Sequence, residues 1–137
     1  MGAARDPWWI IASAAAVLHG AGPIEVGDVD VLLARDDARR ILPTLGLEAR
    51  PGPEHPTLRS EVLGTWRMPP LPVDFLAGFC VRAGDRWVPI EPVTREPIDI
   101  GGGTVYVPAR DELRRIIESF GRPKDFERAR LLAALER

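Results

Sequence analysis

The sequence predicts an α+β fold in which helices pack on one face of a mixed, twisted β-sheet. Three observations support this fold class. Short runs rich in valine, leucine and aromatic residues recur through the first two thirds of the chain, as expected for strands. The last third carries apolar residues at helical spacing. Fourteen prolines and thirteen glycines divide the chain into many short elements.

The composition is that of a globular protein. With 137 residues, 45% of them hydrophobic, the chain is expected to form a single domain over residues 1–137. A net charge of −2, with acidic and basic residues interspersed, gives no strong signal for nucleic acid or a membrane surface as the main partner. The apolar run 7–18 is too short to span a bilayer. Cys80 is the only cysteine, so a reducing, cytoplasmic location is expected.

The chain is expected to begin with a strand followed by a helix. Residues 8–12 are bulky and apolar, which suits a buried strand. Ser13 then precedes an alanine-rich run that ends at Gly20, and this pattern predicts a helix capped by Ser13. The start of a helix attracts anions. Ser13 is therefore expected either to contact an anionic ligand or only to cap its helix.

Residues 28–33 form the most informative predicted strand. Side chains alternate between the two faces of a strand, so Asp28 and Asp30 point the same way and Val29 and Val31 point the other way. Two like charges on one face require a cation, a cationic partner or open water. Two carboxylates at this spacing can also converge on one hard cation.

The middle of the chain is expected to hold short elements. Asp36 or Asp37 is expected to cap a short helix that ends near Pro43. Prolines and glycines predict a loop over 46–57, in which His55 is a weak metal candidate. Further strands are predicted at 58–63, at 65–68, at 71–79 and in short runs within 81–107, with the triple glycine 101–103 as a turn.

Asp74 is the single carboxylate in the apolar strand predicted at 71–79. A carboxylate among valine, phenylalanine and leucine is costly to bury without a partner. Asp74 is therefore expected to face solvent, a partner or a metal ion. Beside a strand that carries Asp28 and Asp30, it becomes a candidate third ligand.

Two helices are predicted at the end of the chain, from 108 to 120 and from 122 to 135. Lys124 falls in the first turn of the second helix, where the helix dipole disfavours a cation. Asp125 is expected to compensate this charge locally. A lysine kept there suggests contact with an anion, and the alternative is an ordinary solvated surface lysine.

The chain carries four motifs in sequence order: Ile11-Ala12-Ser13, Asp28-Val29-Asp30-Val31, Val73-Asp74-Phe75 and Gly121-Arg122-Pro123-Lys124-Asp125. Together they resemble the DNA polymerase beta-like nucleotidyltransferase superfamily, in its small stand-alone bacterial form. The resemblance covers residues 8 to 135, and the last motif also resembles the branch that includes antitoxins of abortive-infection systems and antibiotic nucleotidyltransferases.

The resemblance implies a nucleotidyltransferase-like fold and a Mg²⁺-dependent transfer of NMP from an NTP, with ATP favoured, to a hydroxyl of a protein or a small molecule. Asp28 and Asp30 would bind one or two Mg²⁺ ions, and Asp74 would act as a third ligand or as the general base. Ser13 and Lys124 would contact the phosphates. A chain of this size would borrow its acceptor site from a protein partner or a homodimer.

Three departures from the family pattern support an alternative. Ala12 stands where the family has glycine, the spacer from Ser13 to Asp28 is somewhat long, and the arginine that often precedes the acidic strand is missing, with Glu25 nearby instead. The alternative is a catalytically weak or inactive binding module of the same fold, for example an antitoxin-like partner protein. An exposed apolar patch at Trp66 and 68–70 would favour it. In an enzyme, the three aspartates should converge at an open cleft, opposite Lys124.

Overall fold

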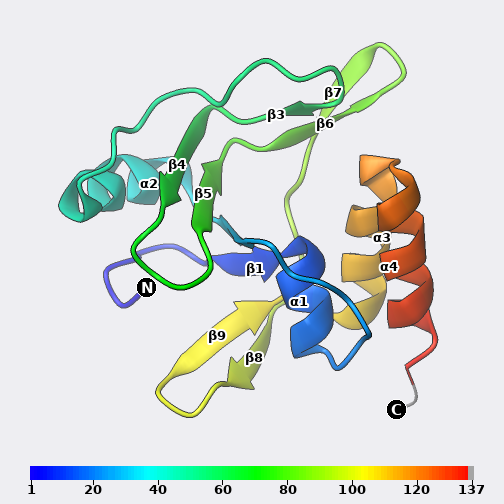
Figure 1. The fold of residues 1–137 in the computed structure, drawn as a ribbon. Helices are drawn as coiled ribbons and strands as arrows, with labels where there is room; N and C mark the ends of the chain where they lie inside the picture. Colours follow the sequence, from blue (N-terminus) through cyan, green and yellow to red (C-terminus); the bar gives the residue numbers. More distant parts are fainter. Residues whose placement is uncertain (136–137) are drawn as a thin grey trace.

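The computed structural model describes residues 1–135, which form nine strands, four α-helices and one 3₁₀-helix (Figure 1). In chain order, the elements are β1 Trp9–Ile11, α1 Ala12–Leu18, β2 Val29–Leu32, α2 Arg35–Ile41, η1 Leu42–Leu45, β3 Leu58–Arg59, β4 Val62–Trp66, β5 Val73–Ala77, β6 Cys80–Ala83, β7 Arg86–Pro89, β8 Glu96–Asp99, β9 Thr104–Val107, α3 Arg110–Phe120 and α4 Pro123–Ala133.

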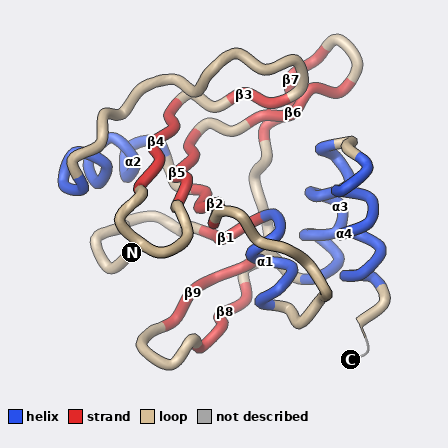
Figure 2. The backbone as a smooth tube through the Cα atoms, viewed as in Figure 1, coloured by secondary structure: helices blue, strands red, loops and turns tan. Residues whose placement is uncertain are grey.

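The central sheet has four strands in the order β1-β2-β5-β4. Strands β2 and β5 are parallel, and the two outer pairs are antiparallel, so the predicted mixed sheet is confirmed. Strands β3, β6 and β7 form a second sheet, and β8 and β9 form a hairpin closed by the triple-glycine turn (Figure 2). The register places Asp30 of β2 beside Asp74 of β5.

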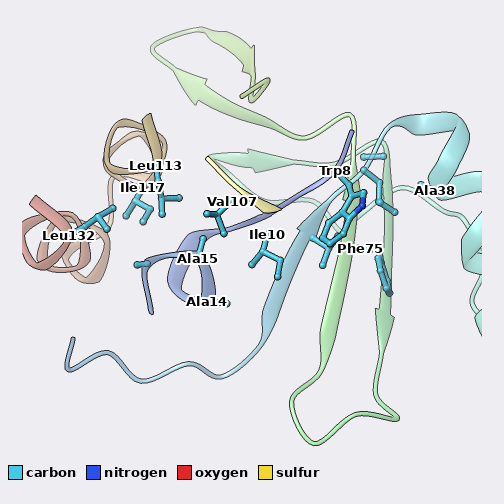
Figure 3. Packing of buried hydrophobic residues seen from close by; sticks show 14 of the residues in the cluster. Trp8, Ile10, Ala14, Ala15, Ala38, Phe75, Val107, Leu113, Ile117 and Leu132 are labelled. Atoms are coloured by element: carbon cyan, nitrogen blue, oxygen red, sulfur yellow. The ribbon is translucent and has the colours of Figure 1, made fainter. Parts of the chain in front are cut away.

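The hydrophobic core lies on the sheet face that carries Val31 and Phe75. All four α-helices contribute to this cluster, and small alanines in α1 let that helix pack close to the sheet and to α3 (Figure 3). The members shown there include Ile10, Ala14, Ala15, Ala38, Phe75, Leu113, Ile117 and Leu132. The arrangement of helices packed against a mixed sheet therefore matches the predicted class.

A second apolar cluster lies on the opposite face of the sheet. It joins Leu32 and Leu76, from β2 and β5, with Phe79 and with Ile116 and Phe120 of α3. Because side chains alternate along a strand, this face also carries the aspartates two positions before each leucine. The second cluster thus forms the apolar floor beside the acidic residues.

Helix α1 begins two residues earlier than the sequence predicts. Its N-cap is Ile11, no side chain caps it, and Ser13 lies buried inside the first turn. The prediction that Ser13 is the cap is therefore wrong. Ala12 joins β1 directly to α1 with a φ of 59°, a left-handed conformation that lets the chain reverse within one residue.

The prediction that Asp36 or Asp37 caps α2 is also wrong. The N-cap is Ala34, and no side chain caps the helix. The carboxylate of Asp37 is buried and accepts hydrogen bonds from the backbone N–H groups of Arg5 and Asp6 instead. A cap and a long-range anchor use the same residue type, so local sequence cannot separate them.

The two C-terminal helices have the predicted limits to within two residues. Helix α3 ends at Gly121, whose φ of 76° is readily adopted by glycine, and Pro123 occupies the first turn of α4. Within residues 1–135, no helix combines the length and the apolar character that crossing a bilayer requires.

Candidate functional site

Three carboxylates meet at one end of the parallel strand pair. Asp30 and Asp74 are direct neighbours on β2 and β5, and Asp28 lies immediately before β2. One oxygen from each carboxylate lies within 4.8 Å of the others. The convergence expected of an enzyme is therefore present, and it follows from the parallel register of two strands that are far apart in sequence.

The donor set of this acidic cluster suits a hard divalent cation. Mg²⁺ prefers carboxylate oxygens at about 2.0–2.1 Å, so ligands on opposite sides of the ion lie about 4.2 Å apart. Oxygens within 4.8 Å of one another need only small side-chain rotations to reach that geometry. The cluster contains no sulfur or nitrogen donor, a composition that favours Mg²⁺ or Mn²⁺ over softer metals.

The electrostatics of the aspartate cluster also favour a bound cation. Burial, followed by the charges of Asp28 and Asp74, raises the pKa of Asp30 to about 7. Burial likewise raises the pKa of Asp28, with a hydrogen bond and charge repulsion from Asp74 adding to the effect. Three carboxylates in one place therefore repel one another at neutral pH, and a divalent cation would relieve this repulsion.

A threonine orients the third carboxylate. Thr65 of β4 is the register partner of Asp74, and its hydroxyl donates a 2.5 Å hydrogen bond to Oδ1 of Asp74. Within residues 1–135, Asp74 forms no ion pair with an arginine or lysine. One oxygen of Asp74 is thus held by Thr65, and the carboxylate also shares a hydrogen bond with Asp28.

The acidic cluster opens into a cavity of about 670 Å³. All five residues singled out in the sequence line this cavity: Ser13, Asp28, Asp30, Asp74 and Lys124. Apolar side chains such as Leu63, Phe79 and Phe120 line another part of it. The chain therefore brings the predicted residues together, with a cationic side, an acidic side and an apolar surface.

Besides Arg59, sequence reasoning missed two further arginines of this cavity, Arg122 and Arg128. Both lie close enough to Asp30 to lower its pKa, although burial and the other carboxylates outweigh them. Arg128 follows Lys124 by four residues, a spacing that puts both side chains on one face of a helix. This spacing is the sequence feature from which Arg128 could have been predicted as a neighbour of Lys124. The carboxylate of Asp125, expected to compensate Lys124, pairs with Arg122 instead.

The loop over 46–57 forms the far side of the cavity through Gly52, Pro53 and His55. The Nδ1 atom of His55 accepts hydrogen bonds from the backbone N–H groups of Thr57 and Leu58. His55 is not part of the acidic cluster, and no other group of potential metal ligands occurs in residues 1–135. Its role is to fix the turn that leads into β3.

Comparison with known proteins identifies the fold. A candidate nucleotidyltransferase from Thermotoga maritima superposes with a TM-score of 0.71 at 18% identity, over 95% of this chain and 83% of that chain. ANT(2'')-Ia, in complex with adenylyl-2''-tobramycin, superposes with a TM-score of 0.55 at 16% identity, over 93% of this chain and 78% of that chain.

A second structure of ANT(2'')-Ia, described as an antibiotic-resistance factor and determined in solution, gives the same TM-score over 73% of its length. No family model matches the sequence, and no curated protein matches it. The likeness therefore lies in three-dimensional structure at low identity. It shows that this chain has the nucleotidyltransferase fold.

Proposed function

We propose that the protein transfers NMP from an NTP, with ATP favoured, to a hydroxyl group and that the reaction requires Mg²⁺. One observation carries the proposal: Asp28, Asp30 and Asp74 converge in a cavity that also presents Lys124. A carboxylate cluster facing cations in one cavity suits a metal-bound polyphosphate better than it suits a neutral ligand. The shared fold agrees with this chemistry.

Each residue of the proposed site has a role that follows from its position. Asp28 and Asp30 hold one or two Mg²⁺ ions, which supply charge neutralisation for the phosphates. Ser13 and Lys124 contact the phosphate oxygens. Asp74, oriented by the hydroxyl of Thr65, serves as a third ligand or accepts a proton from the acceptor hydroxyl.

The proposed reaction is a displacement at the α-phosphorus. The acceptor oxygen forms a new bond to that phosphorus, the bond to the β-phosphate oxygen breaks, and pyrophosphate leaves with the bonding electron pair. The proton of the acceptor hydroxyl passes to a carboxylate, for which Asp74 is the candidate. The chain contributes mainly position and charge, which are the main catalytic factors in phosphoryl chemistry.

A calorimetric titration with each NTP in Mg²⁺ tests this proposal. The unmodified protein should bind at least one NTP, and binding should disappear both in EDTA and in Asp28→Asn/Asp30→Asn. The matched control, Asp36→Asn/Asp85→Asn, removes two exposed carboxylates that do not line the cavity and should bind normally. If the folded protein binds no NTP, the proposal is wrong.

The acceptor is proposed to be a protein or small-molecule hydroxyl that reaches the open mouth of the cavity, with a protein partner or a second copy completing its site. ANT(2'')-Ia was solved with adenylyl-2''-tobramycin, so tobramycin is the first small molecule to test. Transfer is followed as pyrophosphate release that depends on the added acceptor.

A single cysteine fits the proposed cytoplasmic location.

A second candidate function is a binding module of the same fold, such as an antitoxin-like protein. The observation that favours it is an apolar surface on the sheet face opposite the aspartates. Trp66 lines a groove of about 840 Å³ there, at whose base Val31 and Phe75 are buried, and the nearby Met68 is 83% exposed. If the folded protein binds no NTP at all, this candidate is favoured.

A further inference from the structure

Helix α4 presents three cations to the cavity that holds the aspartates. Arg122, Lys124 and Arg128 come from its N-cap and its first two turns, and all three line the cavity. Of these, only Lys124 was expected to act. The neighbouring Arg130 pairs with Glu127 and does not line the cavity. The position of an arginine on the helix therefore decides whether its side chain reaches the cavity.

A buried carboxylate holds one of these cations by hydrogen bonds and lies beside a second. The side chain of Asp125 is 1% exposed, and its two oxygens accept hydrogen bonds of 2.6 Å and 3.1 Å from the guanidinium of Arg122. Nη1 of Arg128 lies 4.0 Å from Oδ1 of the same carboxylate. Asp125 does not line the cavity, whereas both of its arginine partners do.

This geometry leaves the arginines able to bind more. Arg122 offers two nitrogens to Asp125, and a guanidinium carries five N–H donors in a fixed fork. Arg128 approaches the carboxylate only at ion-pair distance, so its donors are not consumed there. A guanidinium oriented by a buried partner suits a phosphate better than a free lysine does, because less side-chain entropy is lost on binding.

The charges across the cavity explain why the cations are needed. Arg128 lines the same cavity as Asp28 and Asp30. A polyphosphate entering this space would meet those carboxylates as well. Cations that line the same cavity offset that repulsion.

We propose that Arg122 and Arg128 bind the polyphosphate of the substrate together with Lys124, and that Asp125 is a positioning residue that orients both arginines without touching the substrate. This inference rests on the proposed nucleotidyl transfer and deepens it, because it identifies a preformed polyphosphate subsite on α4 that is separate from the metal-binding aspartates.

Inorganic tripolyphosphate is the probe, because it lacks the base and the sugar. The titration is made in EDTA on the Asp28→Asn/Asp30→Asn background, where the metal site and much of the repulsion are removed. Tripolyphosphate should bind this protein, and adding Arg128→Gln should weaken binding about tenfold, the loss expected for one charge-assisted contact. Adding Arg130→Gln, the matched control on the same helix, should leave binding within about twofold.

A double-mutant cycle tests the positioning role of Asp125. Asp125→Asn should weaken tripolyphosphate binding on its own, and it should weaken binding much less in an Arg122→Gln background, where the guanidinium that Asp125 holds through two hydrogen bonds is already absent. If Asp125→Asn fails to fold, Arg122→Lys replaces it, since this variant keeps the charge but loses the two-point pairing. Additive losses would overturn the positioning role.

The proposal is overturned if tripolyphosphate does not bind, or if Arg128→Gln and Arg130→Gln bind it equally. These outcomes are independent of the proposed activity. Binding of an Mg²⁺–NTP complex to the unmodified protein tests nucleotidyl transfer separately, because that measurement retains the aspartates.

Discussion

At the scale of single residues, Ala12 is the most unusual position in the described chain. It is the only non-glycine residue within 1–135 that has a positive φ, and it lines the cavity. For an L-residue, the left-handed region costs about 1–2 kcal/mol. The structure therefore explains why a glycine would suit this position: the abrupt passage from β1 to α1 requires that backbone conformation.

Replacing Ala12 by glycine should stabilise the protein by about 1 kcal/mol, because glycine adopts this conformation without the steric cost. Ala15→Gly, in the middle of the same helix and fully buried, should instead destabilise it by about 1 kcal/mol or more. Chemical denaturation measures both free energies of unfolding. The same sign for the two variants would contradict this explanation.

The raised pKa of Asp30 makes stability depend on pH. Between its ordinary value of 3.8 and about 7, the folded protein holds a proton that the unfolded chain releases. The stability contributed by this group is therefore complete below about pH 4 and is lost as the pH rises through 7. This sign is the reverse of that for a salt-bridged aspartate.

Asp30→Asn should consequently stabilise the protein in EDTA at pH 8, by roughly 1–2 kcal/mol, and stabilise it much less at pH 5. Urea denaturation at the two pH values measures the difference. Asp36→Asn, at an exposed position, should show no such pH dependence. An equal effect of Asp30→Asn at both pH values would show that Asp30 ionises normally.

Thr65 is expected to act on metal affinity through Asp74. Thr65→Val keeps the shape of the side chain but removes the hydroxyl that donates to Oδ1. Loss of such a supporting hydrogen bond typically lowers metal affinity about 10–100-fold. Titration with Mn²⁺ measures this, and Thr65→Ser should retain near-normal affinity. Equal affinity in the valine variant would exclude the orienting role.

At the scale of elements, the sequence predicted well which segments are strands or helices, and it predicted poorly where the helices begin. The strand with Asp28 and Asp30, the apolar strand with Asp74 and both C-terminal helices could be recognised from local patterns. The helix starts at 12 and 35 could not, because the caps depend on backbone turns and on contacts more than thirty residues away in sequence.

Asp37 shows what such a long-range contact contributes. Burial raises its pKa, but hydrogen bonds from the N–H groups of Asp6 and Arg5 and from Arg40 outweigh burial and hold the pKa below its usual value. The carboxylate therefore ties the start of the chain to α2 in its charged form, and the stability it contributes is lost as the pH falls through its lowered pKa.

Asp37→Ala should destabilise the protein by about 2 kcal/mol, because it leaves the N–H groups of Arg5 and Asp6 without their acceptor. It should also speed amide hydrogen exchange of residues 5 and 6. Asp36→Ala, next to it but exposed, should change neither quantity by much. Unchanged exchange in Asp37→Ala would show that the anchor is dispensable.

At the scale of the whole molecule, the order of the strands was beyond local sequence. The order β1-β2-β5-β4 places strands next to each other that are some forty residues apart in the chain, and no periodicity encodes that pairing. Yet the fold shared with nucleotidyltransferases and the acidic cluster depend on this one parallel contact. The resemblance of four ordered motifs predicted that the three aspartates converge, but it left the strand order open.

The same whole-molecule view explains why the cations were only partly predicted. Lys124 stood out because it occupies an unfavourable end of a helix, whereas Arg122 and Arg128 looked like ordinary charges of a solvated face. Only the packing of α3 and α4 beside the second apolar cluster shows that these arginines line the cavity that contains the aspartates.

The most direct test of the central proposal is a crystal structure with Mg²⁺ and an ATP analogue whose α,β-bridging oxygen is replaced by a methylene group. We expect metal density among Asp28, Asp30 and Asp74, with the phosphate chain lying toward Lys124. A nucleotide bound elsewhere, or bound in the cavity with no metal at the three aspartates, would contradict the proposed metal-dependent nucleotidyl transfer.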